Sequence, residues 1–495
     1  MAERKRLLLR LMRKKKKIIL PHVLMEAYAA EGKSLARVEG KVIFAEGVVP
    51  GDVVDLRLRK NKKDWAEGTP IQFRSYSADR VQPFCQHFGV CGGCQWQMLP
   101  YEKQLQYKQQ QVTDSLKRIG KVDMPQIMPI RGAAETRFYR NKLEYTFGNK
   151  RYLLPGELND EDINGEIDVA GFHARGFFDK VVDIEKCWLQ PEPTNEIRLA
   201  AKQFAKEHQY SFYDIREHRG FMRTMQVRTA TTGEVMVNMV VGEDDEKKIK
   251  DLMQFLKNRF PFVTTWLYTI NTKKNDSLYD LHPVIYHGKG HIIEELSTLE
   301  GKKFKFKIGP TSFFQTNTKQ GEQLYRITSD FAELTGQEIV YDLYCGTGSI
   351  GIFVSNLAKK IIGVETVVAA VEDAKENAML NQADHAEFYA GDVIDVCDDA
   401  FFANHGRPDV IITDPPRAGM HEKLVLKILE MEAPTVVYVS CNPATQARDL
   451  SLLKEKYDVT RIQPVDMFPH TLHIENVVQL KLRKKQANDQ AEHLL

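Results

Sequence analysis

Long apolar runs are absent from this sequence of 495 residues. No run approaches the roughly 18 apolar residues that a helix needs to cross a bilayer, so we expect no membrane partner. The early stretch LLLRLMRKKKKIIL is interrupted by charged side chains, and it therefore lacks the apolar centre of a secretion signal. We accordingly expect the protein to be cytoplasmic.

Cysteine is also scarce, with seven residues in the chain. Thiols in the cytoplasm are kept reduced, so grouped cysteines are candidates for metal ligands or catalytic groups ahead of disulfides. A large excess of one charge is missing too, because the formal net charge is only +2. Basic side chains nevertheless dominate residues 1–17. This basic arm suits nucleic acid or an anionic surface, and it equally suits a solvated tail.

Three domains are expected after this arm, from the length and from the changing pattern along the chain. Residues 18–76 carry short alternating runs between turn signals, which predicts a small β-barrel. Residues 77–305 mix strands and helices without a parallel rhythm, which predicts an α+β domain. In residues 306–495 apolar strands alternate with helices, as in an α/β doubly wound, Rossmann-like sheet. The helical segment at 95–125 is a candidate to pack on this last domain.

A glycine turn marks the first part of a candidate cofactor site. DLYCGTGSIGI, residues 342–352, lies where a strand passes into a helix, and its glycines let the backbone approach a ligand. The next strand ends at Glu365, where an acid binds ribose hydroxyls in nucleotide folds. Asp392 and Asp414 follow the next two strands. This order resembles the S-adenosylmethionine-dependent methyltransferases, and a NAD site fits less well because the GxGxxG fingerprint is absent.

A thiol stands at the end of the following strand. In VVYVSCNPATQARDL, residues 436–450, an apolar run stops at Ser440 and Cys441. Free cysteine packs well in a core, so a structural role is the simple interpretation. The alternative is a nucleophile, because Asp414 ends the neighbouring strand and Glu475 lies beside another strand near the C-terminus. One site would then hold a thiol and two carboxylates.

This combination suits the methylation of carbon 5 of uracil. Carbon 5 is too weak a nucleophile to take a methyl group directly, but addition of a thiolate at carbon 6 makes it nucleophilic. A base must then remove the carbon 5 proton before elimination frees the enzyme. The target base must also leave its stack to reach such a site.

Four motifs in order resemble the RNA uracil-5-methyltransferase family. They are DLYCGTGS, DPPRAG, VVYVSCNPATQARDL and DMFPHTLHIE. The resemblance covers nearly the whole chain, and it implies that Cys441 is the nucleophile, Glu475 the base and Asp414 a further active-site residue. The contacts that it implies for S-adenosyl-L-methionine are Gln315, Tyr344, Ser349, Glu365, Asp392 and Asp414. Tyr344 stands where many members have Phe, and Ser349 stands where many have Asn.

Four further cysteines predict a metal centre. Cys85, Cys91 and Cys94 follow a C-x5-C-x2-C spacing, and Cys187 lies far along the chain. The spacing leaves zinc open but favours an iron–sulfur cluster, because two close CxxC pairs are absent. The resemblance implies a [4Fe-4S] cluster, found in members that modify ribosomal RNA, most closely those of the 23S type. It also implies a TRAM domain, similar to oligonucleotide-binding barrels, in GKSLARVEGKVIFAEGVVPGDVV.

RNA is the expected partner, with 23S ribosomal RNA ahead of transfer RNA, and no obligate protein partner is evident. Residues 139–148 and 171–187 mix cations with aromatics as RNA-binding surfaces do, although solvated strand faces explain them equally well. An amino-group methyltransferase is the alternative enzyme. Such enzymes often follow Asp-Pro-Pro with an aromatic residue, whereas Arg417 follows here. An inactive RNA-binding protein is the third hypothesis, and the intact Cys441 argues against it.

Overall fold

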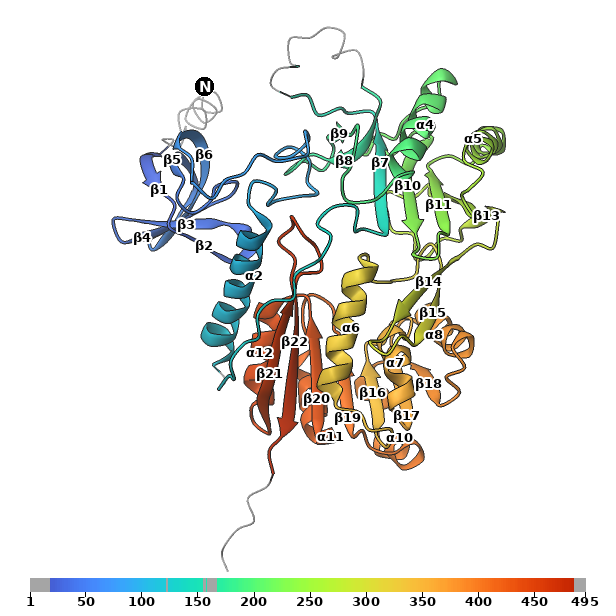
Figure 1. The fold of residues 1–495 in the computed structure, drawn as a ribbon. Coiled ribbons are helices and arrows are strands. Elements are labelled where there is room, and N and C mark those ends of the chain that lie inside the picture. Colours follow the sequence, from blue (N-terminus) through green and yellow to red (C-terminus); the bar gives the residue numbers. More distant parts are fainter. Residues whose placement is uncertain (1–17, 122, 155–156, 158–166, 485–495) are drawn as a thin grey trace, which may run out of the picture. The chain divides into compact units, whose positions relative to one another are not determined.

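A computed structural model describes residues 18–121, 123–154, 157 and 167–484 (Figure 1). The basic arm predicted at 1–17 lies outside the described residues. Contacts along the chain separate two compact units. The first comprises Met1–Gly89, Cys94–Tyr107 and His470–Leu472, and the second comprises Val90–Gly93, Lys108–Pro469 and His473–Leu495.

The first unit is built on a six-stranded sheet in the order β1-β5-β6-β4-β3-β2. Its strands are β1 (Ile19–Leu24), β2 (Ala27–Tyr28), β3 (Ser34–Val38), β4 (Lys41–Ala45), β5 (Val53–Asn61) and β6 (Trp65–Ser75), with a short 3-10 helix η1 (Ala30–Gly32). Alternate side chains face a core that includes Ile43, Val54 and Leu56, because successive strand residues point to opposite sides. Residues 18–76 therefore form β structure, whereas a closed TRAM barrel stays a prediction.

The helix α2 (Tyr101–Ser115) begins in the first unit. The fully buried Gln104 side chain donates to the carbonyl oxygens of Trp96, at 3.1 Å, and Leu99, at 3.0 Å. Its own oxygen accepts the His470 N–H at 2.8 Å. Gln104 thus ties the late segment His470–Leu472 to this unit.

The helix then continues in the second unit and ends in a π turn, η2 (Leu116–Gly120). Val112 and Leu116 share a core cluster with Ala447 and Leu450 of α12 (Pro443–Leu453). A Cβ on Gly120 would lie 3.3 Å from the Ala447 carbonyl oxygen, so only glycine fits there without displacement. The later part of the segment 95–125 accordingly packs on α12.

A mixed sheet of seven strands follows, in the order β13-β12-β11-β10-β7-β8-β9. Its strands are β7 (Lys142–Gly148), β8 (Val169–His173), β9 (Val181–Asp183), β10 (Met222–Thr229), β11 (Val235–Val241), β12 (Thr265–Ile270) and β13 (Val284–His287). Among neighbouring strands of this sheet in the described chain, β11 and β12 are parallel and the other pairs are antiparallel. Helices α4 (Thr194–Glu207) and α5 (Glu246–Arg259) pack on this sheet. The predicted mixture of strands and helices is therefore observed.

The last sheet also has seven strands, in the order β18-β17-β16-β19-β20-β22-β21. They are β16 (Ile339–Leu343), β17 (Lys360–Glu365), β18 (Ala386–Ala390), β19 (Val410–Thr413), β20 (Thr435–Ser440), β21 (Tyr457–Val465) and β22 (Glu475–Leu482). The first five in that order are parallel, as the sequence predicts for a doubly wound sheet. β22 is antiparallel to β20 and to β21 and lies between them.

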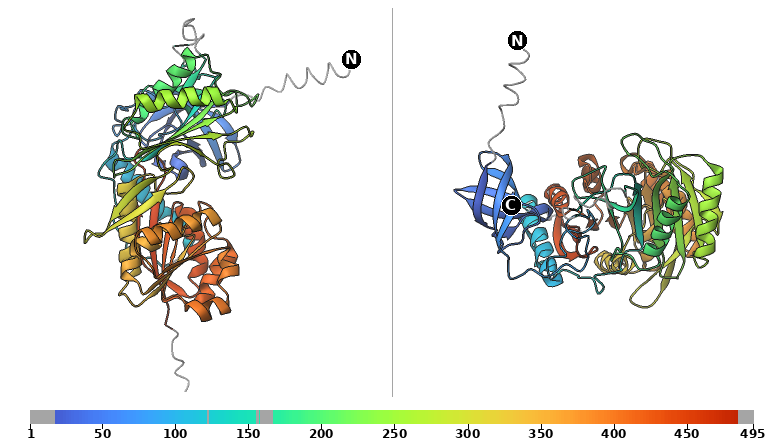
Figure 2. Two further views of the ribbon diagram at one scale, coloured as in Figure 1. Left: turned by 90° about the vertical axis from the view of Figure 1, so that its right-hand side faces the viewer. Right: turned by 90° about the horizontal axis from the view of Figure 1, so that it is seen from above.

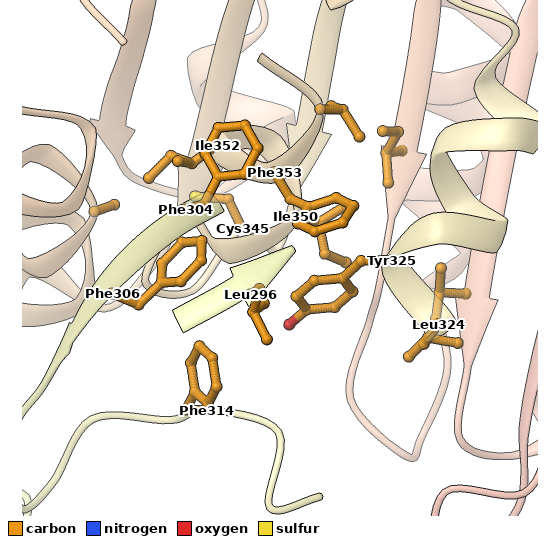
Figure 3. Packing of buried hydrophobic residues seen from close by; sticks show 14 of the residues in the cluster. Leu296, Phe304, Phe306, Phe314, Leu324, Tyr325, Cys345, Ile350, Ile352 and Phe353 are labelled. Carbon is orange, nitrogen blue, oxygen red and sulfur yellow. The ribbon is translucent and has the colours of Figure 1, made fainter. Parts of the chain in front are cut away.

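Helices cover both faces of this last sheet (Figure 2). They are α6 (Thr318–Ala332), α7 (Ser349–Val354) with its 3-10 extension η4 (Ser355–Leu357), α8 (Val368–Leu380), α9 (Val393–Val396), α10 (Asp399–His405), α11 (Glu422–Met431) and α12. The hairpin β14 (Ile292–Ser297) and β15 (Lys303–Ile308) adds Leu296, Phe304 and Phe306 to one core, beside Tyr325 and Phe353 (Figure 3). Within the described ranges no helix is long and apolar enough to span a membrane.

Candidate active site

The strand order of the last sheet reverses between β16 and β19. Ligands of doubly wound sheets bind beyond the carboxyl ends of the strands at such a point. The residues predicted for the site follow these ends: Tyr344 after β16, Glu365 at the end of β17, Asp392 shortly after β18, Asp414 after β19 and Cys441 after β20. Five predicted site residues therefore lie at or just beyond the carboxyl ends of the strands of this sheet.

Carboxylates fix the glycine turn at this edge. Glu365 accepts the Gly346 N–H at 3.2 Å and the Val367 N–H at 2.9 Å. Asp342, buried in the strand, accepts the Gly351 N–H at 2.8 Å. Gly346 has a φ of 53°, and a Cβ on it would meet no atom within 4 Å. The turn therefore presents bare backbone to open space, which suits a bound ligand.

Two other predicted cofactor contacts already have structural roles. The exposed Asp392 caps α9 by accepting the Ile394 N–H at 2.9 Å. Gln315 precedes α6 and is buried, and its backbone carbonyl accepts the Asn141 side-chain amide at 2.9 Å.

Tyr325 is a residue of this site that sequence reasoning missed. Its hydroxyl lies 2.8 Å from the Ser349 hydroxyl, at the start of α7. Burial raises the pKa of Tyr325, and the negative charges of Asp414, Asp342 and Glu475 raise it further. Tyr325 occupies an apolar position of an amphipathic helix, so its sequence pattern indicates only a core residue.

Cys441 and Glu475 lie at one corner of the sheet. The antiparallel pairing sets Ser440 of β20 opposite Asn476 of β22. Cys441 is the residue after Ser440, and Glu475 is the residue before Asn476. Both therefore lie next to this pair, at the same end of the two strands. Glu475 is 7% exposed, whereas Cys441 and Asp414 are partly buried. The strand pairing therefore brings the thiol and the two carboxylates to the same end of neighbouring strands.

These groups perturb one another strongly. Burial raises the pKa of Asp414 to about 7, and burial with the neighbouring Asp414 raises the pKa of Glu475 well above its usual range. Burial, together with Glu475 and Asp414, raises the pKa of Cys441 to about 12, while Arg417 acts in the opposite direction. The thiol is therefore protonated near neutral pH, and the two carboxyl groups hold less than their full negative charge.

The loop after β19 is tied to the helix that follows Cys441. Asn442 caps α12 by accepting the Ala444 N–H at 3.1 Å, and its amide donates to the Arg417 carbonyl oxygen at 3.1 Å. Asp449, on α12, accepts the Met420 N–H at 2.9 Å. These bonds fix the segment that carries Asp414 against the segment that carries Cys441.

The four cysteines of the predicted cluster are divided between the two units. Cys85 and Cys94 belong to the first unit, and Cys91 and Cys187 belong to the second. Cys187 is buried, and its N–H donates to the Asn195 side chain at 2.8 Å. Among the residues that the structure describes, no group of three or more His, Cys, Asp or Glu side chains is placed to hold a metal ion. The cluster therefore remains a prediction.

An aromatic pair with two cations lies near the residues 139–148 singled out in the sequence. The rings of Phe138 and Trp188 are 5.6 Å apart, and both are partly exposed. The Lys186 ammonium is 4.4 Å from the Trp188 ring centre, and the Arg137 guanidinium is 5.6 Å from it. Phe138 has a φ of 55°, a conformation that bulky residues rarely adopt. We call these four residues the aromatic platform.

Comparison with known proteins agrees with this geometry. The model of the tRNA (Uracil-5-)-methyltransferase family matches residues 402–483, and that of the methyltransferase small domain matches residues 305–435. A solved structure, the Pyrococcus abyssi tRNA (uracil-54, C5)-methyltransferase in complex with S-adenosyl-L-homocysteine, is 28% identical. It aligns with a TM-score of 0.71 over 93% of this chain and 100% of its own.

Two bacterial relatives are closer in sequence. An uncharacterized RNA methyltransferase of Bacteroides thetaiotaomicron is 53% identical over 92% of this chain and 100% of its own length. One of Porphyromonas gingivalis is 49% identical over 91% of this chain and 98% of its own length. With the thiol, the two carboxylates and the glycine turn at one edge of its sheet, the chain belongs to the RNA uracil-5-methyltransferase family and is an RNA methyltransferase.

Proposed function

We propose that this enzyme methylates carbon 5 of a uridine in RNA, with S-adenosylmethionine as the methyl donor. The observation that carries the proposal is the position of Cys441 at the end of β20, beside Glu475 at the start of β22 and at the edge that bears the glycine turn. An amino-group methyltransferase would have no use for a thiol at this point. The family relationship supports the same reaction.

In the proposed reaction Cys441 is the nucleophile and Glu475 the base. The Cys441 sulfur adds to carbon 6 of uracil, and the electron pair of the 5,6 double bond makes carbon 5 nucleophilic. S-adenosylmethionine supplies a methyl group on a positively charged sulfur, and carbon 5 takes it. Glu475 then removes the carbon 5 proton, and the electrons of that bond reform the double bond and expel the Cys441 thiolate.

The perturbed pKa values fit this division of labour. A carboxylate whose pKa is raised is a stronger base, as removal of the carbon 5 proton requires. The partly exposed Cys441 thiol must first lose its proton to solvent, and the negative charges of Glu475 and Asp414 oppose that loss. A bound sulfonium would offset those charges, so we infer that the methyl donor binds before the thiol reacts.

We infer that the donor lies along the glycine turn. Glu365 would accept hydrogen bonds from its ribose hydroxyls, as acids at this position do in nucleotide folds. The bare backbone at Gly346 leaves room for the nucleoside. The remaining proposed contacts are Gln315, Tyr344, Ser349, Asp392 and Asp414. The solved P. abyssi relative is in complex with S-adenosyl-L-homocysteine, which supports the choice of methyl donor.

The test is covalent trapping on RNA that contains 5-fluorouridine. Fluorine at carbon 5 cannot leave as a proton, so the wild-type enzyme and S-adenosylmethionine should stall as a methylated protein–RNA adduct. Cys441→Ala is the control and should form none. Absence of an adduct with RNA that the wild-type enzyme methylates would refute the thiolate mechanism.

For the substrate we infer 23S ribosomal RNA, from the resemblance of the four cysteines to those of the ribosomal members. Transfer RNA is the second candidate, because the P. abyssi relative is a tRNA methyltransferase. Incubation with each RNA, prepared from a strain that lacks this enzyme, would separate them. Incorporation of labelled methyl groups into transfer RNA alone would overturn the first assignment.

We also propose that Cys85, Cys91, Cys94 and Cys187 bind a [4Fe-4S] cluster in the protein as made in the cell. No catalytic step requires it, because methyl transfer from a sulfonium moves no net electrons. Iron, sulfide and zinc analysis of anaerobically purified protein tests the proposal, with Cys187→Ser as the control. Stoichiometric zinc, or metal content unchanged in Cys187→Ser, would refute it.

RNA contacts are proposed for two surfaces. The six-stranded sheet of residues 18–76 would serve as a TRAM barrel that binds RNA through its loops and exposed strand face. The aromatic platform combines rings that can stack on bases with cations that can contact phosphates. Because Arg140, two residues from Phe138, lies 4.9 Å from the Phe468 ring, the platform adjoins the segment that leads to Glu475.

A further inference from the structure

A buried ion pair lies under the segment that leads into β22. Nζ of Lys108, on α2, is 2.6 Å from Oδ1 of Asp466, and both side chains are 0% exposed. The same ammonium donates to the Phe468 carbonyl oxygen at 3.1 Å. The same Asp466 oxygen also accepts the Phe468 N–H at 3.1 Å. Removing two charges from water costs free energy, which this ion pair and its bonds to the Phe468 backbone partly offset.

Three more side chains hold this segment, residues 466–469, by its backbone carbonyl oxygens. Gln320 donates to the first at 2.8 Å, Asn317 to the second at 2.9 Å and the Tyr139 hydroxyl to the last at 2.9 Å. Asn317 also caps α6 and follows the predicted cofactor contact Gln315 by two residues. The segment is thus fixed against the start of α6 as well as against α2.

Residues 466–469 contact His473, which lies two residues before Glu475. The His473 ring lies 6.1 Å from the Phe468 ring, nearly perpendicular to it. Val465, the residue directly before this segment, also pairs with Glu475 across β21 and β22. A displacement of residues 466–469 would therefore move the start of β22.

We propose that Lys108 is a positioning residue for Glu475, acting through its buried bond to Asp466. This inference rests on the proposed function, because it assigns Lys108 to one step of that reaction. Sulfur–carbon bond formation and methyl transfer involve Cys441 and the donor, whereas removal of the carbon 5 proton requires Glu475 within hydrogen-bond reach of that proton. Loss of the pair should therefore slow the release of methylated RNA and spare the earlier steps.

The double variant Lys108→Met/Asp466→Asn tests this. It removes both charges together and so avoids leaving one buried and unpaired, which would destabilise the fold. With ordinary RNA in a single turnover, methyl incorporation should stay within about threefold of wild type. The methylated RNA should remain attached to Cys441, and multiple-turnover rates should fall about 100-fold, the effect of a misplaced general base.

Three comparisons keep the outcome clear. Glu475→Gln shows how complete loss of the base behaves, and Lys103→Met removes a partly exposed ion pair with Asp79 from the same helix and should behave as wild type. Lys108→Gln/Asp466→Asn is a second variant that also removes both charges but keeps polar side chains at both positions, and it should accumulate the same adduct. The 5-fluorouridine adduct must form in every variant except Cys441→Ala.

Wild-type release rates in both Asp466 variants would overturn the proposal. Loss of the 5-fluorouridine adduct along with turnover would also overturn it, since the pair would then support the whole site and not the base. If wild-type enzyme itself formed no adduct, the proposed function would fail, and that result is separate from any effect of Lys108.

Discussion

The hydroxyl groups of Tyr325 and Ser349 lie 2.8 Å apart and join the buried face of α6 to the start of α7. Ser349 is a proposed contact of the methyl donor, and its side-chain hydroxyl is hydrogen-bonded to the Tyr325 hydroxyl. The pair therefore links the helix that follows Gln315 to the glycine turn.

Tyr325→Phe should weaken binding of S-adenosylhomocysteine about three- to tenfold, the usual effect of losing one hydrogen bond. Isothermal titration calorimetry would measure the dissociation constant. Tyr286→Phe is the matched control, because it removes a hydroxyl that donates to Gln254 at 3.0 Å on the surface. An unchanged affinity in Tyr325→Phe would show that Ser349 does not contact the donor.

Glu475→Gln should methylate ordinary RNA once and then remain attached to it. The amide cannot accept the carbon 5 proton, so turnover should fall by about 10²- to 10⁴-fold while adduct formation continues. Denaturing gel electrophoresis with labelled methyl donor would reveal the adduct. Free methylated RNA released at the wild-type rate would remove Glu475 from the role of base.

The Cys441 thiol should react slowly with iodoacetamide in the free enzyme. Its pKa of about 12 lies above that of an ordinary thiol, so the thiolate is scarce below that pH and its fraction rises tenfold with each pH unit. At pH 8 the thiolate fraction should be on the order of 10³-fold below that of an ordinary cysteine with a pKa near 8.5.

Asp414→Asn should accelerate that alkylation, because the Asp414 carboxylate is one of the charges that raise the pKa of Cys441. Mass spectrometry of the Cys441 peptide would give the rate at several pH values. Sinefungin, which carries a positive charge near the position of the donor sulfur, should accelerate it as well, whereas uncharged S-adenosylhomocysteine should not. Equal rates with both ligands would contradict the proposed order of binding.

Trp188→Ala should weaken RNA binding about 5- to 150-fold, since a base stacked on an aromatic ring contributes about 1–3 kcal/mol. Fluorescence anisotropy with a labelled substrate RNA would measure the dissociation constant. Phe262→Ala provides the control, because Phe262 is 50% exposed and follows α5, outside the aromatic platform. Equal affinity of the two variants would exclude the platform from the RNA path.

The sequence was sufficient to predict which residues lie at the carboxyl ends of the strands in the last sheet. Glu365, Asp414 and Cys441 each end or follow an apolar strand, and parallel strands bring their carboxyl ends to one side. The same pattern did not show that β22 lies between β20 and β21, because strand neighbours depend on contacts far apart in the chain. Family resemblance, rather than pattern, singled out Glu475.

Tyr325 and Lys108 illustrate what a pattern cannot predict. Lys108 is one of several polar residues in a helix whose sequence is polar on most sides, so nothing marks it as buried. Its partner Asp466 lies 358 positions away. Their importance arises from tertiary packing, and only the folded structure brings them together.

The position of β22 between β20 and β21 affects the order in which parts of the site are completed during translation. In the seven-stranded sheet of the described chain, β21 lies at the edge beside β22, and β22 is the last strand along the chain. A nascent chain that has emerged only as far as β21 holds the glycine turn and Cys441, but neither Glu475 nor the strand that joins β21 to β20. During translation the proposed nucleophile therefore emerges before the proposed base, and β21 can join the sheet only after β22 has emerged.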